Sequence, residues 1–216
     1  EGRITVTKAL ARSNDIFFYR LGENIGIDKL VEYSRRLGLG AKTGVDLPGE
    51  ASGLMPSPLW AEKEWGSRWF LGDTYHVSIG QGDLLTTPLQ VNRIFAEIVS
   101  GKKCAPRLVG VSDCVDLSIS AKARGTVMKG MRMACESGGT GFHFFDLNGA
   151  VFCKTGTAQH GGETTKPHAW ISVVVPREKM DDWVVVTVML SEAGEGSEQA
   201  GPVARKIVDY LLQNEP

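Results

Sequence analysis

The tripeptide Lys-Thr-Gly occurs twice in this chain, at residues 42–44 and at residues 154–156. Each copy places an ammonium group beside a hydroxyl, and the second copy continues into another hydroxyl at Thr157. Ammonium and hydroxyl groups together can bind a carboxylate through charge-assisted hydrogen bonds. The residues around each copy must decide whether either one has such a role.

The two copies lie in different surroundings. Residues 38–58, around the first copy, are rich in glycine and proline, which predicts a long loop and an exposed turn. The second copy follows a strand-like run, and side chains alternate along a strand, so Thr155 and Thr157 share one side and Lys154 takes the other. Gly156 would let another chain approach the backbone. We therefore expect the second copy to bind an extended peptide at a strand edge, with the hydroxyls on its carboxylate.

A plainer structural interpretation competes with each candidate residue. Lys154 would face water on an ordinary amphipathic strand, and the tripeptide by itself favours that interpretation. Ser13, in the run Ser-Asn-Asp at residues 13–15, would be a helix N-cap, because these are the preferred capping residues. A capping turn is also a rigid platform for a hydroxyl, so the two roles of Ser13 are compatible.

The pattern of apolar residues predicts the elements that must position these groups. Helical patterns occupy residues 4–12, 15–26, 28–40, 87–101 and 122–141 and return at 197–213. Three β-branched and aromatic runs, at 149–159, 168–176 and 182–192, predict antiparallel strands, the last two joined by a turn at 177–181. Helices first, strands later and a final helix indicate an α+β domain rather than a regular βαβ alternation.

A few residues mark where the expected elements begin and how they pack. Thr87 is the expected N-cap of the helix that has Pro88 at its first position. The final helix is expected to bury one apolar face, made of Val203, Ile207, Val208 and Leu211. Three tryptophans, Trp60, Trp65 and Trp69, are expected to pack elements together.

The composition excludes several classes of function. The chain has 216 residues, is 42% hydrophobic and carries a net charge of −1, so no basic surface argues for nucleic acid. It has no run of about eighteen apolar residues that would span a bilayer. The four cysteines show no metal-ligand spacing and are most simply buried apolar residues, although Cys104 and Cys114 could bridge in an oxidising compartment.

Several longer phrases lie in a recognisable order. The run at Ser13–Asp15 precedes "TGVDLPGE" (residues 43–50), "SIGQGDLLTTPLQ" (78–90), "KTGTAQ" (154–159), "HAWISVVVP" (168–176) and "GPVARKIVDYLL" (201–212). Together they closely resemble the C-terminal part of the transpeptidase domain of class B penicillin-binding proteins. The resemblance covers nearly the whole chain. It implies a serine β-lactamase/transpeptidase-like α+β fold, with helices packed on an antiparallel sheet that is partial here.

The resemblance also implies an activity. Members of this family are D,D-transpeptidases that cross-link peptidoglycan: a serine attacks the D-Ala-D-Ala carbonyl of one stem peptide, and the acyl group passes to an amine of a neighbouring strand. Ser13 would help relay a proton to the leaving amine, and Lys154 would supply positive charge. Thr155, Gly156 and Thr157 would form the substrate-binding strand, where the two hydroxyls bind the substrate carboxylate. The N–H of Thr157 would form half of an oxyanion hole.

Two features depart from the family pattern. Asp15 stands where the family usually has asparagine, as in the elongation-type subgroup, penicillin-binding protein 2, and a carboxylate cannot donate a hydrogen bond unless protonated. The SxxK motif that carries the nucleophile has one formal match, Ser100–Lys103, in the wrong order and at a helix end, while Thr5–Lys8 has threonine and adjoins Ser13. We therefore expect residues 1–216 to be the C-terminal portion of the domain, cut from a longer protein and inactive alone.

Further expectations follow from the resemblance. No metal or organic cofactor is implied. The partners would be peptidoglycan stem peptides, β-lactam antibiotics and cell-wall synthesis proteins, in the periplasm or outside the cell, with the parent anchored in the membrane. An incomplete sheet would favour self-association. Two other functions stay open: a serine β-lactamase-like hydrolase, which a β-lactam hydrolysis assay would distinguish, and a non-catalytic peptidoglycan-binding or β-lactam-binding sensor module.

Overall fold

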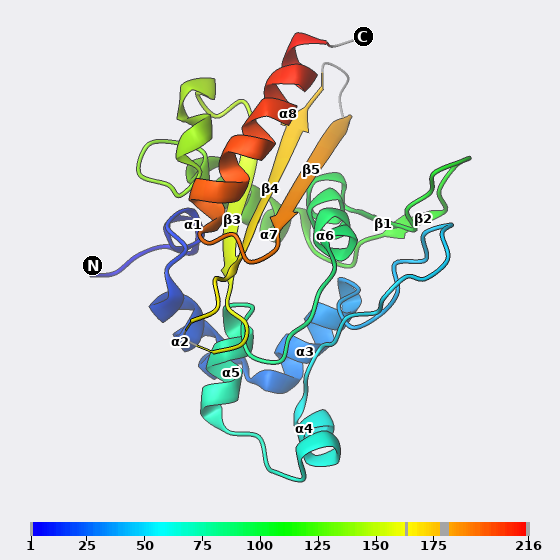
Figure 1. Cartoon of the computed structure of the whole chain (residues 1–216), viewed down its shortest axis with the longest axis vertical. Coiled ribbons are helices and arrows are strands. Elements are labelled where there is room, and N and C mark those ends of the chain that lie inside the picture. The colour runs from blue at the N-terminus through cyan, green and yellow to red at the C-terminus, as the bar shows by residue number, and fades with distance from the viewer. Residues whose placement is uncertain (1, 163, 178–181, 215–216) are drawn as a thin grey trace. The chain divides into compact units, whose positions relative to one another are not determined.

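The structure is a computed structural model that describes residues 2–162, 164–177 and 182–214, with elements labelled as in Figure 1. The chain divides into two compact units. The first unit comprises Glu1–Ser13, Phe95–Lys102 and Val115–Pro216, and the second comprises Asn14–Ile94 and Lys103–Cys114. The position of one unit relative to the other is not determined.

The first unit is built on a three-stranded antiparallel sheet. Its strands, in the spatial order β3-β4-β5, are β3 (Phe152–Ala158), β4 (His168–Pro176) and β5 (Trp183–Leu190). The three predicted strands are confirmed, and Thr157 of β3 pairs with Ala169 of β4. The turn predicted at 177–181 falls, from residue 178 onward, outside the described residues.

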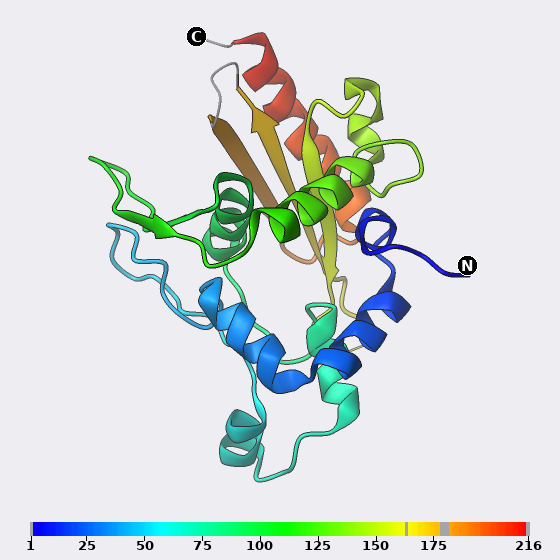
Figure 2. The ribbon, with the colours of Figure 1, turned by 180° about the vertical axis from the view of Figure 1, so that it is seen from behind.

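Helices cover both faces of this sheet. Helix α8 (Gly201–Gln213) crosses one face (Figure 1), and α7 (Ala121–Ala134) crosses the other (Figure 2). Successive residues of β4 are buried on opposite sides: Val173 packs with Val208 of α8, whereas Val174 packs with Met131 of α7. A strand with two covered faces needs apolar residues at consecutive positions, which explains the unbroken Val-Val-Val run of β4.

The predicted inward face of the last helix was partly wrong. Val203 and Ile207 are 40% and 39% exposed, while Ala204 and Val208 are fully buried and Leu211 packs against the same core. The prediction from periodicity favoured the large apolar residues Val203 and Ile207 for the core, but α8 approaches the sheet through the small residue Ala204. A five-residue π-helical turn, η2 (Gly196–Ala200), leads into α8.

Helix α1 (Val6–Ala11) packs against α7, and the chain reaches Ser13 directly after α1 ends. The contact is close at Gly130 of α7, because a Cβ there would lie 2.8 Å from the Cβ of Leu10. The sequence between α7 and β3 forms a short 3-10 helix, η1 (Phe142–Leu147). The predicted helices at 4–12 and 122–141 are therefore present but shorter.

The second unit is mostly helical. It contains α2 (Asp15–Ile25), α3 (Ile27–Arg36), α4 (Pro58–Trp65), α5 (Leu71–Ser78) and the first half of α6 (Pro88–Ser100). Helices α2, α3 and α6 match the prediction, whereas α4 and α5 were not predicted. The Thr87 hydroxyl accepts from the N–H of Gln90 at 3.2 Å, which confirms Thr87 as the N-cap of α6.

The loop at 38–58 is present as predicted, and Gln90 holds it in place. The Gln90 side chain is fully buried, and its amide donates to the carbonyls of Ala41 and Ser52 at 2.8 Å each. Of the three tryptophans, Trp69 packs in the core of this unit, and Trp60 and Trp65 contact each other edge to face on α4.

All four cysteines form disulfides, which corrects the expectation of unpaired buried residues. Cys104 and Cys114 join at the two short strands β1 (Lys102–Cys104) and β2 (Cys114–Asp116), so the bridge left open from sequence is present. Cys135 and Cys153 form a second bridge between the end of α7 and β3, with Cα atoms 5.8 Å apart. Their spacing in sequence gave no sign of it, because only the packing of α7 on β3 brings them together.

Candidate active site

The strand β3 brings the candidate lysine to the candidate serine. The Lys154 ammonium donates to the Ser13 hydroxyl oxygen at 2.8 Å and to the carbonyl of its neighbour Thr155 at the same distance. Both residues belong to the first unit, although 141 positions separate them in the sequence. An ammonium at this distance favours the deprotonated form of the hydroxyl, so the pair can pass a proton to or from a third group.

Ser13 is held in an unusual backbone conformation. Its φ is 50°, in the left-handed region that costs an L-residue about 1–2 kcal/mol. The capping role is taken by its neighbour: the Asn14 side chain accepts from the N–H of Phe17 at 2.9 Å and starts α2. The interpretation of Ser13 as an N-cap is therefore wrong, and its hydroxyl turns to Lys154 instead.

The two threonines of the strand have hydrogen-bond partners that the sequence did not reveal. The Thr155 hydroxyl donates to the hydroxyl of Thr140 at 2.8 Å. The Thr157 hydroxyl donates to the carboxylate of Glu195 at 2.7 Å and accepts from the N–H of Gly196 at 3.2 Å. Thr140 and Glu195 lie in glycine-rich connecting segments that carry no motif, so only the fold identifies them.

Gly156 has a packing role in this strand. A Cβ at Gly156 would lie 3.3 Å from the Cβ of Trp170 on β4, so the space beside it is already occupied. A Cβ on Gly196 would overlap the carbonyl oxygens of Gly156 and Trp170, which means that the turn η2 packs its backbone directly on these strands. The Glu195–Gly196 segment is thereby fixed beside Thr157.

The segment before β3 anchors the strand at its other end. Cys153, next to Lys154, is bridged to Cys135, and a Cβ on Gly141 would lie 2.5 Å from the Cys153 sulfur. Thr140 comes from this same segment. The disulfide and the Thr140–Thr155 hydrogen bond together hold β3 against the end of α7.

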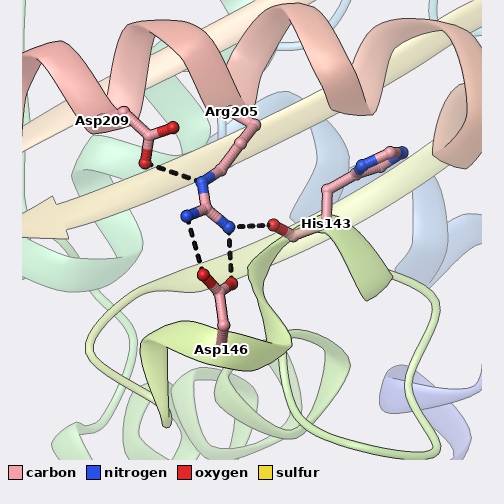
Figure 3. A network of polar contacts seen from close by, with 4 residues as sticks. All are labelled: His143, Asp146, Arg205 and Asp209. Atoms are coloured by element: carbon pink, nitrogen blue, oxygen red, sulfur yellow. Dashed lines mark hydrogen bonds and ion pairs between the residues drawn. The ribbon is translucent and has the colours of Figure 1, made fainter.

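An arginine of α8 holds the 3-10 helix η1, which lies between Thr140 and β3 in the sequence (Figure 3). The Arg205 guanidinium donates to both carboxylate oxygens of Asp146, to the His143 carbonyl and to Asp209 of its own helix. The hydrogen bonds from Arg205 hold the pKa of Asp146 below its ordinary value. The hydrogen bond to Asp146, and after it the one to Asp209, raises the pKa of Arg205, so Arg205 and Asp146 both stay charged near neutral pH. This network is structural and supports the segment that leads into β3.

Asp15 lies in the second unit, exposed at the first position of α2, whereas Ser13 and Lys154 belong to the first unit. A carboxylate is electrostatically favourable at a helix N-terminus. The structure therefore gives Asp15 a local role that is independent of catalysis.

The other sequence candidates are engaged elsewhere. The Ser100 hydroxyl donates to the carbonyl of Ala96 at 2.7 Å, within its own helix, and the Lys103 ammonium donates to the Arg36 carbonyl at 2.6 Å. Thr5 accepts from the N–H of Lys8 as the N-cap of α1. In the first Lys-Thr-Gly copy Lys42 is exposed as predicted, but Thr43 is buried. Its backbone N–H donates to the carboxylate of Glu50.

Within the described residues, no group of three or more His, Cys, Asp or Glu side chains is arranged to hold a metal ion. No helix in the described part of the chain is long and apolar enough to span a membrane.

Comparison with known proteins gives a consistent match. Residues 1–209 match the model of the penicillin-binding protein transpeptidase domain. The chain is 32% identical over 240 residues to the peptidoglycan D,D-transpeptidase MrdA of Haemophilus influenzae, covering 98% of this chain and 37% of that protein. The chain thus spans little more than a third of the length of this relative.

Solved structures agree with the sequence matches. The PBP2 of Helicobacter pylori, in its complex with MreC, is 34% identical with a TM-score of 0.86, over 99% of this chain and 41% of that one. The PBP2 of Pseudomonas aeruginosa, in complex with WCK 5153, is 30% identical with a TM-score of 0.88, over 100% of this chain and 49% of that one. The expected serine β-lactamase/transpeptidase-like fold is confirmed by these matches.

Proposed function

The chain belongs to the penicillin-binding protein transpeptidase family, and on that premise we propose that the whole protein is a peptidoglycan D,D-transpeptidase of the PBP2 type. The observation that carries the proposal is the 2.8 Å contact between the Lys154 ammonium and the Ser13 hydroxyl, because these are the two motif residues that the reaction needs side by side. The matches to MrdA and PBP2 proteins support the same substrate class.

In the proposed reaction a serine outside residues 1–216 is the nucleophile. The chain has no serine in a suitable SxxK setting, and it spans little more than a third of the H. influenzae relative. The serine oxygen bonds to the D-Ala-D-Ala carbonyl carbon, the peptide C–N bond breaks, and the Ser13 hydroxyl relays a proton to the departing D-Ala amine. An amine of a second stem peptide then displaces the serine from the ester. The proton that this amine loses returns to the serine oxygen.

Lys154 and the strand residues have distinct tasks in this scheme. The Lys154 charge keeps the Ser13 hydroxyl acidic enough to relay a proton. The N–H of Thr157 faces the charge that develops on the carbonyl oxygen. The hydroxyls of Thr155 and Thr157 bind the carboxylate of the stem peptide, and Gly156 keeps the strand close to its neighbour.

The site is proposed to work outside the cytoplasmic membrane, where peptidoglycan and β-lactam antibiotics are found. The whole protein would act with other cell-wall synthesis proteins, as the structure of the H. pylori PBP2 with MreC suggests by analogy. For Asp15 we propose only the local role that its position at the start of α2 supports, which is to favour that helix N-terminus with its negative charge.

Labelling with a fluorescent penicillin tests the proposal. In the whole protein, Lys154→Met should slow acylation by on the order of a hundredfold or more, because general acid–base assistance has that size. Lys103→Met is the matched control, since Lys103 also donates to a backbone carbonyl but lies in the discarded Ser100–Lys103 motif. Equal labelling of Lys154→Met and the unsubstituted protein would refute the role of Lys154. Covalent labelling of residues 1–216 alone, at Ser100 or Ser13, would refute a nucleophile outside this chain.

A further inference from the structure

The Thr157 hydroxyl, which is proposed to bind the substrate carboxylate, is already hydrogen-bonded to a carboxylate of the chain itself. Glu195 follows β5 and accepts the Thr157 hydroxyl hydrogen bond at 2.7 Å. Thr157 in turn accepts from the N–H of Gly196 at 3.2 Å. A hydroxyl has one proton to donate, and here that proton is directed at Glu195.

The two threonines differ in how readily they can change partners. Thr155 donates to another hydroxyl, Thr140, which can itself become a donor when Thr155 turns to a ligand. Thr157 donates to a carboxylate, which only accepts while it is ionised. A ligand carboxylate must therefore displace Glu195 from Thr157, and the two negative charges also repel each other.

The position of Glu195 is set by the fold. Gly196 packs so closely on β3 and β4 that a Cβ would overlap the carbonyl oxygens of Gly156 and Trp170. The backbone beside Glu195 therefore cannot move away as a unit, whereas the Glu195 side chain is exposed and can rotate into water. The arrangement is a fixed backbone that carries a displaceable carboxylate.

We propose that Glu195 is a specificity-determining residue that competes with carboxylate ligands for the Thr157 hydroxyl. This inference rests on the proposed function, because it concerns the same strand and the same substrate group. It predicts that the site selects ligands whose carboxylate is held at more than one point, since a single weak carboxylate contact cannot displace Glu195.

The test compares Glu195→Ala with Glu198→Ala in the whole protein. Glu198 is an exposed carboxylate three residues away, in the turn η2, so its removal changes the net charge equally. The rate constant of acylation is measured with a penicillin that carries its carboxylate and with the ester in which that carboxylate is blocked.

Glu195→Ala should raise the rate constant for the carboxylate penicillin about threefold to fivefold, the size expected for an exposed charged contact. It should leave the ester rate unchanged, and Glu198→Ala should leave both unchanged. An unchanged or lower rate with the carboxylate penicillin, or an equal rise with the ester, would overturn the proposal.

A second measurement separates this inference from the proposed function. If the unsubstituted protein is not acylated by any penicillin, the transpeptidase proposal fails, and the role of Glu195 is decided by binding of N-acetyl-D-alanine. The NMR signal of the Gly196 amide reports that binding, because this N–H donates to Thr157. Tighter binding in Glu195→Ala but not in Glu198→Ala supports the inference, and equal binding in all three proteins refutes it.

Discussion

Two glycines of α7 should respond in opposite directions to the same substitution. Gly125 has open space where a Cβ would be, so Gly125→Ala should only gain helix propensity, about 0.5–1 kcal/mol. Gly130 faces α1, and a Cβ there would lie 2.8 Å from both the Cβ and the Cδ1 of Leu10 and 3.2 Å from the Thr7 carbonyl oxygen. The Cβ of Leu10 and the Thr7 backbone cannot rotate away, so α1 must shift.

The magnitude follows from the difference between the two variants. Inserting a methyl into a well-packed contact costs about 1–3 kcal/mol. The propensity gain is common to both variants and cancels, so Gly130→Ala should be less stable than Gly125→Ala by that amount. In a chain of this size each kcal/mol corresponds to about 2–4 °C in Tm.

Urea and thermal unfolding of the two variants, with the unsubstituted chain alongside, measure this difference. Stabilisation of both variants by the same amount would refute the close contact between α1 and α7. The result also concerns the site, because α1 ends directly before Ser13. A shifted α1 should lengthen the contact between Ser13 and Lys154, so in the whole protein Gly130→Ala should also slow acylation by penicillin while Gly125→Ala does not.

Two further predictions concern the supports of β3. Arg205→Met should destabilise the chain near neutral pH, because it removes the ion pair with Asp146. Arg205 lowers the pKa of Asp146, so the stability that this pair contributes is present above the ordinary carboxyl pKa of 3.8. It is lost as the pH falls through the lowered pKa. Urea unfolding near neutral pH and in acid checks this. A difference as large in acid as near neutral pH would contradict the pairing, because, among the contacts made by Arg205, only the one with the His143 carbonyl does not titrate. After mild reduction, alkylation should label Cys104 and Cys114 before Cys135 and Cys153, because Cys114 is exposed while the latter two are fully buried. Mass spectrometry of the labelled peptides gives the order, and simultaneous labelling of all four would count against a buried second disulfide.

Local patterns were sufficient to predict most of the elements. The β-branched runs of β3, β4 and β5 and the capped helix after Thr87 have strong local signals, since alternation, periodicity and capping act between near neighbours. Helices α4 and α5 were missed because each is only eight residues long and neither shows a clear apolar stripe. The face of α8 was misassigned because the small Ala204, rather than the larger Ile207, approaches the sheet.

The motif phrases and their order were enough to recognise the family and to single out Ser13 and Lys154 as site residues. The contacts of the site follow from the folded chain: the Lys154–Ser13 contact, the Cys135–Cys153 bridge and the hydrogen bonds of Thr155 and Thr157 with Thr140 and Glu195. A motif encodes only residue types at short spacing. A hydrogen bond between distant segments depends on how α1, α7 and η2 pack against one sheet, and no local pattern specifies that packing.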